Sequence, residues 1–421
     1  MQAKALPGFR DFYPEDLALR THIFATWRAV ATRYGFEEYD GPPLEALELY
    51  TQKSGAEIVG QLYHFRDKGD REVALRPEMT PTLARMVGAR APALRKPIRW
   101  FAIPQVFRYE RQQRGRLREH FQLNMDIIGE PSAAADAEVI AAAVDVLRAF
   151  GLGPGEIRLR LSDRRVLAAA LGRAGVAAGE LDGVLAALDK LDRAREYALE
   201  LLGRALGGEA GRVEAVMAVV ASLDTPGDLL ATAEAAPLHD CLDRLGAMGL
   251  GAFVDVDFRI VRGLAYYTGI VFELFDAGRA LRAICGGGRY DQLLGQVSGV
   301  ALPCVGFGMG DVVLAELLKN RAFERAAPRR LDAFLVAVSG DDERAVLGLA
   351  HTLRDRGLAV EYALRSGSVR RQLELAAARG APRAVILGPD ERAAGTAVVR
   401  DLVGGAETRV PLTRVEQGRF D

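Results

Sequence analysis

The sequence predicts an α+β protein that carries a separate α/β domain at its C-terminus, and three observations lead to this prediction. Strand-like alternation rich in aromatic, arginine and proline residues fills residues 1–162 and returns over 251–323. An alanine- and leucine-rich stretch, 163–250, lies between them and reads as all-helical. After a polar linker at 324–330 (ERAAPRR), residues 331–421 alternate between strand and helix.

The composition excludes several classes of protein. A chain of 421 residues is long enough for two to four domains, at roughly 100–200 residues per domain. The net charge of −1 argues against a polybasic protein, and 49% hydrophobic with 26% charged residues excludes a disordered chain. Only six of the 55 basic residues are lysine. Arginine suits carboxylate and phosphate binding, although a GC-rich genome would produce the same bias.

The sequence also bears on location and metal content. No apolar run reaches the roughly 20 residues of a membrane span, and the N-terminus lacks the apolar core of a signal peptide. The three cysteines, Cys241, Cys285 and Cys304, show no CxxC spacing, so neither a disulfide framework nor a zinc ribbon is supported. We expect a cytoplasmic protein with no membrane contact and no metal site.

Residues 75–87 (LRPEMTPTLARMV) read as a loop that enters a helix. Arg76, Glu78 and Thr80 form a polar triplet, and Pro81 suits the first helical position. Glu78 and Thr80 can cap this helix or line a cleft, and the two interpretations are compatible.

The most informative stretch is 107–130, where two predicted strands flank an arginine-rich loop. Five arginines (108, 111, 114, 116 and 118) fall within eleven residues. A pair of antiparallel strands joined by this loop would hold several guanidinium groups over one place, which suits a triphosphate or a nucleic-acid backbone. A solvated hairpin is the alternative. The polar residues Glu110, Gln122 and Asp126 on otherwise apolar strands favour binding, because burying them without a partner is costly.

In the helical segment, apolar residues recur at spacings of three and four: Leu181, Val184, Leu185, Leu188, Leu191, Ala194 and Tyr197. After it, a strand is expected from Gly269, following Arg262 and the pair Tyr266 and Tyr267. Three glycines in AICGGGRYD (283–291) allow the backbone to approach a ligand closely. In VGFGMGDVV (305–313) glycine alternates with bulky residues before a helix, which is also compatible with a tightly packed strand-to-helix joint. Neither a dinucleotide-binding fingerprint nor a P-loop is present.

The last 90 residues predict a mostly parallel sheet of βαβαβ order. Its elements are strands at 331–338, 358–363 and 384–388, helices at 341–356 and 369–379, and further strands near 396–403 and 408–412. Gly357 and Gly380 are expected to end the two helices.

Together these segments resemble the class II aminoacyl-tRNA synthetases, and their order over essentially the whole chain resembles the histidyl-tRNA synthetase family. YGFEEYDGPPL (34–44) is similar to motif 1, with Pro43 at the dimer-interface proline. FRYER and GRLREHFQ (107–122) are similar to motif 2. RGLAYYTG (262–269) resembles the signature peculiar to histidine enzymes, followed by the glycine-rich floor GGGRYD. The resemblance implies an antiparallel-sheet catalytic domain with a helical insertion, and a C-terminal α/β anticodon-binding domain.

The resemblance also implies a reaction and roles for single residues. Histidine is activated with ATP, taken as its Mg²⁺ complex, and is then transferred to histidine tRNA by a homodimer without a tightly bound cofactor. Histidine would be held by Glu78, Thr80, Gln122, Asp126, Arg262, Tyr266 and Tyr267, with Asp126 and Tyr267 facing the imidazole. Arg108, Glu110 and Arg116 would bind ATP, Gln113 would meet the tRNA acceptor end, and Arg108 and Arg262 would act on the α-phosphate.

Two positions depart from the family pattern. Ala265 stands where the signature has aspartate, and Val313 stands where motif 3 has an arginine against ATP. These departures leave open an alternative, a non-catalytic paralogue that senses histidine as regulatory subunit of ATP phosphoribosyltransferase. Against it, the motif 2 arginines are intact and a C-terminal α/β segment is present.

Overall fold

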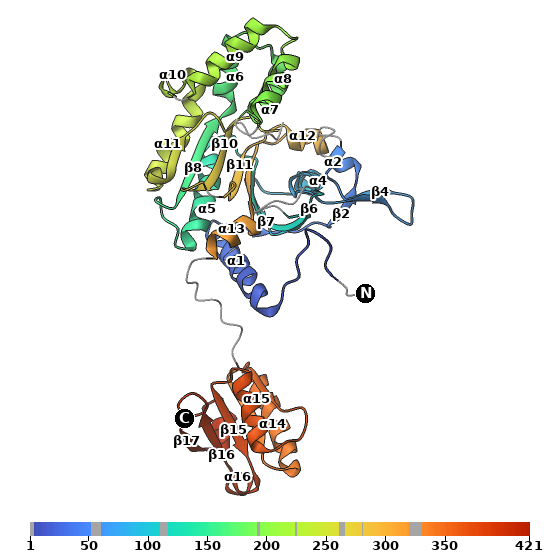
Figure 1. The fold of residues 1–421 in the computed structure, drawn as a ribbon, viewed down its shortest axis with the longest axis vertical. Helices are drawn as coiled ribbons and strands as arrows, with labels where there is room; N and C mark the ends of the chain where they lie inside the picture. The colour runs from blue at the N-terminus through green and yellow to red at the C-terminus, as the bar shows by residue number, and fades with distance from the viewer. Residues whose placement is uncertain are drawn as a thin grey trace. The chain divides into compact units, whose positions relative to one another are not determined.

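The computed structural model describes residues 4–51, 60–109, 117–191, 194–223, 225–260, 266–279, 281–319 and 331–421. The chain divides into two compact units, Met1–Ala322 and Phe323–Asp421 (Figure 1). Each unit is described by itself below. The α+β class and the C-terminal α/β unit are confirmed, while the boundaries expected within the first unit stay predictions.

A nine-stranded, mostly antiparallel sheet forms the centre of the first unit. Its order is β1-β5-β7-β12-β11-β10-β8-β9, and β6 pairs with β7 off this path. Among the described strands of this sheet, only the edge pairs β1–β5 and β8–β9 are parallel. The bounds are β1 (Glu37–Glu38), β5 (Ile98–Ala102), β6 (Gln105–Phe107), β7 (Glu119–Ile128), β8 (Ile157–Asp163), β9 (Val254–Val256), β10 (Ile270–Asp276), β11 (Cys285–Arg289) and β12 (Cys304–Gly310).

The two faces of this sheet differ sharply, and β7 shows why. Leu123, Met125 and Ile127 alternate onto a face that is covered by α5 (Ala133–Ala149), behind which pack α1 (Pro14–Arg33) and α11 (Ala236–Ala247). Because successive side chains of a strand point to opposite faces, Gln122, Asn124 and Asp126 lie on the other one. The apolar face is the core, so the polar residues line the face that is left for a ligand.

Apolar packing partly covers the second face as well. The helices α4 (Thr80–Arg90) and α12 (Leu293–Ser298) pack together over it, and Leu83, Val87, Leu293 and Leu294 join one buried cluster with Tyr267 and Tyr290. A small antiparallel sheet of β2 (Leu44–Ala46), β4 (Glu72–Leu75) and β3 (His64–Arg66), with the short helix α2 (Glu48–Thr51), accompanies α4.

The start of α4 corrects one expectation. The helix begins at Thr80 with Met79 as its N-cap residue, so Pro81 occupies the second position and no side chain caps the helix. Glu78 and Thr80 are therefore left for the cleft interpretation.

Between β8 and β9 the chain is helical, as predicted: α6 (Arg164–Arg173), α7 (Leu181–Leu188), α8 (Arg195–Ala205), α9 (Ala210–Ser222), α10 (Gly227–Leu230) and α11. The predicted apolar face is correct for Val184, Leu185 and Leu188, which are buried. It does not extend further, because α7 ends at Leu188 and Tyr197 lies largely exposed on α8. Helix α13 (Asp311–Leu318) closes the first unit.

The second unit is a five-stranded sheet of order β14-β13-β15-β16-β17. The predicted elements are present as β13 (Ala333–Ala337), α14 (Glu343–Asp355), β14 (Val360–Tyr362), α15 (Val369–Ala378), β15 (Arg383–Leu387), β16 (Thr396–Asp401) and β17 (Glu407–Pro411). The first three strands are parallel, but β16 runs antiparallel to both of its neighbours. The short helices α16 (Pro389–Ala394) and α17 (Leu412–Val415) were not expected.

Gly357 and Gly380 follow α14 and α15 with φ angles of +83° and +69°. These left-handed conformations explain why glycine ends both helices. Within the described parts of the chain, no helix has the length and apolarity needed to span a bilayer.

Candidate functional site

The glycines of β12 make room for polar side chains of β7. In the β7–β12 register Gly306 lies opposite Asp126. A Cβ atom at Gly306 would come within 1.9 Å of Asp126 Oδ1, and one at Gly308 within 2.5 Å of Gln122 Nε2. The alternation of glycine in VGFGMG therefore lets two polar side chains of the neighbouring strand lie flat across the sheet.

Asp126 is the most unusual group on this face. Its side chain is 2% exposed, and Tyr290 donates a hydrogen bond of 2.5 Å to Oδ1. The other oxygen, Oδ2, is buried and has no hydrogen-bond partner. Burial raises the pKa of Asp126 to about 7, against the lowering effect of the Tyr290 bond. An unpaired buried acceptor of this kind is costly unless a ligand completes it.

A second open polar atom belongs to Tyr39. Its backbone N–H bonds to the carbonyl of Phe101, and its ring packs against Trp100 with ring centroids 5.4 Å apart. Trp100 is the register partner of Asp126. The Tyr39 hydroxyl is buried without a partner, and burial together with the nearby Asp126 charge raises its pKa well above the usual range. One donor and one acceptor are thus left open in the same buried region.

Glu78 and the neighbouring tyrosines extend this region. Tyr266 donates to Glu78 Oε2 over 3.4 Å, and its ring centroid lies 5.0 Å from that of Tyr267 and 5.9 Å from that of Tyr290. Burial raises the pKa of Glu78, while Arg108 and the Tyr266 bond act in the opposite direction. Thr80 is buried two residues beyond Glu78.

A cleft opens beside these groups at the ends of β7, β11 and β12. Arg108 and Gln122 line it together with Arg282 and Val313. The Arg108 Nε donates to the Pro77 carbonyl over 2.9 Å, which holds the guanidinium near Glu78. Gly286, Gly308 and Gly310 also line the cleft. None of the described residues that line it is acidic.

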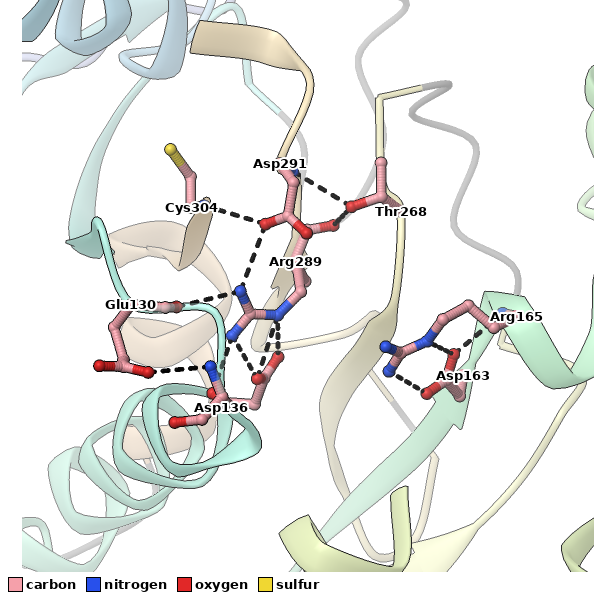
Figure 2. Close-up of polar contacts among 9 residues, drawn as sticks. Glu130, Asp136, Asp163, Arg165, Thr268, Arg289, Asp291 and Cys304 are labelled. Atoms are coloured by element: carbon pink, nitrogen blue, oxygen red, sulfur yellow. Dashed lines mark hydrogen bonds and ion pairs between the residues drawn. The ribbon is translucent and has the colours of Figure 1, made fainter. Parts of the chain in front are cut away.

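Arg289 fixes the end of β11, directly before Tyr290. Figure 2 shows its guanidinium among Asp136, Asp291 and the Glu130 carbonyl. Asp291 in turn accepts a bond from the Cys304 backbone N–H, and its own N–H donates to the Thr268 hydroxyl (Figure 2). Removing one partner of a buried arginine–aspartate pair strongly destabilises the fold, because the other charge is left buried and unpaired. The network therefore positions Tyr290 from both sides.

The junction of β12 with α13 is held from the N-terminal segment. Arg10 bonds to Glu119 over 2.6 Å and to Asp311 over 2.9 Å, and Asp311 also accepts the Phe121 N–H. Burial raises the pKa of Asp311, against the effect of Arg10. Asp311 is thus a structural residue, and the next positions, Val312 and Val313, present an apolar wall to the cleft.

The structure brings together most of the residues singled out in the sequence: Glu78, Thr80, Arg108, Gln122, Asp126, Tyr266 and Tyr267 all lie on or beside this face of the sheet. Glu110, Gln113, Arg116 and Arg262 lie outside the described residues, as does Ala265.

Sequence reasoning missed Tyr39, Tyr290 and Arg282. Tyr290 stood within the glycine-rich segment GGGRYD, and Tyr39 stood within the stretch similar to motif 1, so position in a motif was the only available signal. No cluster of three or more His, Cys, Asp or Glu side chains suited to a metal occurs in the part of the chain that the structure describes.

Comparisons with known proteins agree on one family. A family model described as Histidyl-tRNA synthetase matches residues 8–311, and one described as Anticodon binding domain matches residues 332–418. The histidine–tRNA ligase of Opitutus terrae is 44% identical over 423 residues, covering 98% of this chain and 97% of that protein. The chloroplastic/mitochondrial histidine–tRNA ligase of Arabidopsis thaliana is 40% identical over 415 residues, with coverages of 97% and 85%.

The likeness extends to three dimensions. The crystal structure of histidyl-tRNA synthetase from Nostoc sp. PCC 7120 matches with a TM-score of 0.76, covering 99% of both chains at 23% identity, which shows a shared fold. The two family models together, the sequence relatives and the shared fold each cover both units of the chain. The chain belongs to the histidyl-tRNA synthetase family.

Proposed function

We propose that this chain activates L-histidine with ATP to histidyl-adenylate and pyrophosphate, and then transfers the histidyl group to histidine tRNA. The observation that carries the proposal is the pair of open, buried atoms, Asp126 Oδ2 and the Tyr39 hydroxyl. Membership of the family over nearly the whole chain supports the same reaction.

An imidazole matches this pair. A neutral imidazole has one N–H donor and one nitrogen acceptor, so it can donate to Asp126 Oδ2 and accept from the Tyr39 hydroxyl. Side chains that lack this combination would leave a buried group unpaired, which is the strongest source of discrimination open to such a pocket. Tyr266 and Tyr267 would enclose the ring, and Glu78, Thr80 and Gln122 would hold the α-amino end.

The cleft beside the pocket, whose described lining residues include no acid, suits ATP. Arg108 would contact the histidine carboxylate and the α-phosphate, so that a carboxylate oxygen attacks the α-phosphorus and pyrophosphate leaves. Such transfers depend mainly on positioning and charge stabilisation, for which guanidinium groups suffice. Following the family resemblance, Arg262 acts on the same α-phosphate, and Glu110 and Arg116 position ATP, which enters with Mg²⁺.

The tRNA is proposed to contact both units. Gln113 would meet its acceptor end, and the second unit, which matches the anticodon-binding family model, would meet the anticodon. On the same resemblance, the chain is proposed to form a homodimer with Pro43 at its interface. A cytoplasmic location is proposed on the same ground.

The alternative is a regulatory paralogue that binds histidine without using it. Two observations favour the enzyme: the relatives named above are ligases at 40–44% identity, and the second unit is present.

Histidine-dependent ATP–pyrophosphate exchange by the purified chain tests the proposal. We expect exchange with Mg²⁺, and its near-complete loss in Arg262→Ala while histidine binding persists at reduced affinity, because the other six residues assigned to histidine recognition are unchanged. A chain that binds histidine but exchanges no pyrophosphate at any ATP concentration would be a sensor, and the enzyme proposal would be dropped.

The same assay tests the imidazole pocket. Tyr39→Phe removes one hydrogen bond to an uncharged group, worth about 0.5–1.5 kcal/mol, so the histidine KM should rise roughly 2- to 12-fold with the ATP KM unmoved. Tyr197→Phe, on an exposed residue of α8, is the matched control and should change neither constant. Equal rises in both constants for Tyr39→Phe would remove Tyr39 from the pocket.

A further inference from the structure

The cleft beside the histidine pocket, which the proposed reaction assigns to ATP, contains a second described arginine, Arg282, to which that reaction gives no role. Among its described lining residues, Arg108 and Arg282 are the permanent cations, and none is an aspartate or a glutamate, although Glu78 in the adjoining pocket lies near Arg108. The remaining walls are glycine, alanine and other uncharged groups, with His120 beside Gly310. A concave site with one sign of charge attracts an anion.

The two arginines come from different parts of the fold. Arg108 follows β6, and its backbone N–H pairs with the carbonyl of Arg118 at the end of the β6–β7 ladder. Arg282 precedes β11 on the connection from β10, and its side chain is exposed. Since β7 and β11 flank β12 in the sheet, the two side chains reach the cleft from either side of the glycine-bearing strand.

The described part of the wall between them provides no third permanent cation. Val312 and Val313 lie in the first turn of α13, and both line the cleft with apolar side chains. The floor is built from Gly286, Gly308 and Gly310, where a ligand can approach the backbone without meeting a Cβ atom.

We propose that Arg282 is a substrate-binding residue that contacts the triphosphate of ATP, across the cleft from Arg108 and in place of a cation at position 313. The proposal rests on the proposed function and deepens it, because it assigns a phosphate contact to a residue outside the family motifs. Guanidinium groups pair with phosphate oxygens by two parallel hydrogen bonds, so two arginines on opposite sides hold a triphosphate in one orientation.

The test measures ATP–pyrophosphate exchange and, separately, ATP binding by calorimetry on the full chain. One charge-assisted contact corresponds to roughly 10- to 100-fold in affinity. Arg282→Ala should therefore raise the ATP KM and Kd by about that factor, with histidine affinity unchanged, and Arg282→Lys should recover part of the loss. Arg244→Ala is the control, since Arg244 is exposed on α11, pairs with Asp240 and lies behind the opposite face of the sheet.

A second variant tests the place of the charge. Val313→Arg added to Arg282→Ala should restore at least half of the lost ATP affinity on a logarithmic scale, because both positions face the same cleft. A double variant whose ATP affinity is no higher than that of Arg282→Ala would show that positions 282 and 313 do not serve the same phosphate site.

An ATP KM and Kd within twofold of the wild type in Arg282→Ala would overturn the proposal, as would an equal loss of histidine and ATP affinity. The outcomes separate from those of the proposed function. If the wild type shows no histidine-dependent exchange, the proposed function fails, while the calorimetric comparison of ATP binding still decides the role of Arg282.

Discussion

Asp126 combines a stability cost with its proposed role in recognition. A carboxylate buried with one oxygen unpaired destabilises the folded chain in its charged form, which is why its pKa is raised to about 7. A structural residue at this place would be selected to be apolar or fully bonded. The open oxygen is therefore best explained by a ligand that supplies the missing donor, as the imidazole of the proposed reaction does.

This cost predicts a pH-dependent stability. The unfolded chain releases the Asp126 proton near 3.8 and the folded chain near 7, so folding binds a proton between these values and stability falls as pH rises through that window. Asp126→Asn removes the titration. The free energy of unfolding of the variant, relative to that of the wild type, should rise by about 2 kcal/mol from pH 5.5 to pH 8. The histidine KM of the variant should rise far more than its ATP KM.

Thermal melting at the two pH values measures the gain. The buried Ser162 provides a control, because Ser162→Ala removes a hydroxyl that does not titrate and should shift the melting temperature equally at both pH values. A constant difference between Asp126→Asn and the wild type would mean that Asp126 stays ionised throughout.

Single residues also show where prediction from sequence ends. Asp126 could be singled out because a carboxylate on an otherwise apolar strand is unusual, and Glu78 because it belongs to a polar triplet where a loop enters a helix. Tyr290 and Tyr39 could not be singled out, because Tyr290 lies 164 residues after Asp126 and Tyr39 lies 87 residues before it. Only the sheet order brings Tyr290 to Asp126, and only the Trp100 register brings Tyr39.

At the scale of elements, β12 explains how a strand becomes part of a binding face. Its glycines were compatible in sequence with a tightly packed joint, but their neighbours are the polar side chains of β7. Three features were predictable from the alternation of residue types and from the glycines that end helices: β12 is a strand, a helix follows it, and strands alternate with helices in the C-terminal unit. The antiparallel direction of β16 was not predictable, because strand direction depends on partners that are distant in the sequence.

Substitutions of these glycines should therefore differ in a predictable order. In Gly306→Ala the new methyl would overlap Asp126 and lie 2.8 Å from the Met125 carbonyl, which is backbone and cannot move aside. Overpacking of about 1–3 kcal/mol predicts a rise in the histidine KM of roughly 5- to 160-fold. Gly308→Ala meets only the flexible end of Gln122 and should cost less than about tenfold.

Gly203→Ala is the control for these glycine variants. Nothing lies within 4 Å of the added methyl on α8, so this change should leave histidine use unaltered and stabilise the helix by about 0.5–1 kcal/mol. A Gly306→Ala protein with wild-type histidine KM would show that Asp126 does not need its observed position over β12.

At the scale of the whole molecule, the two units have separate cores. The buried clusters of the second unit are built from residues 331–421 alone, around Leu335 on one face of its sheet and Phe334 on the other. The described clusters around the proposed histidine pocket and the small sheet use residues of the first unit only. The compositional change around residues 324–330 made this division predictable, because each unit satisfies its own hydrophobic pattern.

Separate cores predict that activation and charging can be separated. A chain that ends at Lys319 keeps the described residues of the proposed histidine pocket and ATP cleft. Because each unit has its own core, deleting the second unit should leave the core of the first unit buried. Histidine-dependent pyrophosphate exchange should therefore stay within about threefold of the full chain. Transfer to tRNA should fall by roughly 100-fold or more, since base contacts cost about 1–3 kcal/mol each when lost and several would go with the second unit. Exchange kinetics and tRNA charging, measured on the same preparation with circular dichroism as the test of folding, check both halves. A folded, truncated chain that charges tRNA as fast as the full chain would contradict the assignment of tRNA binding to the second unit.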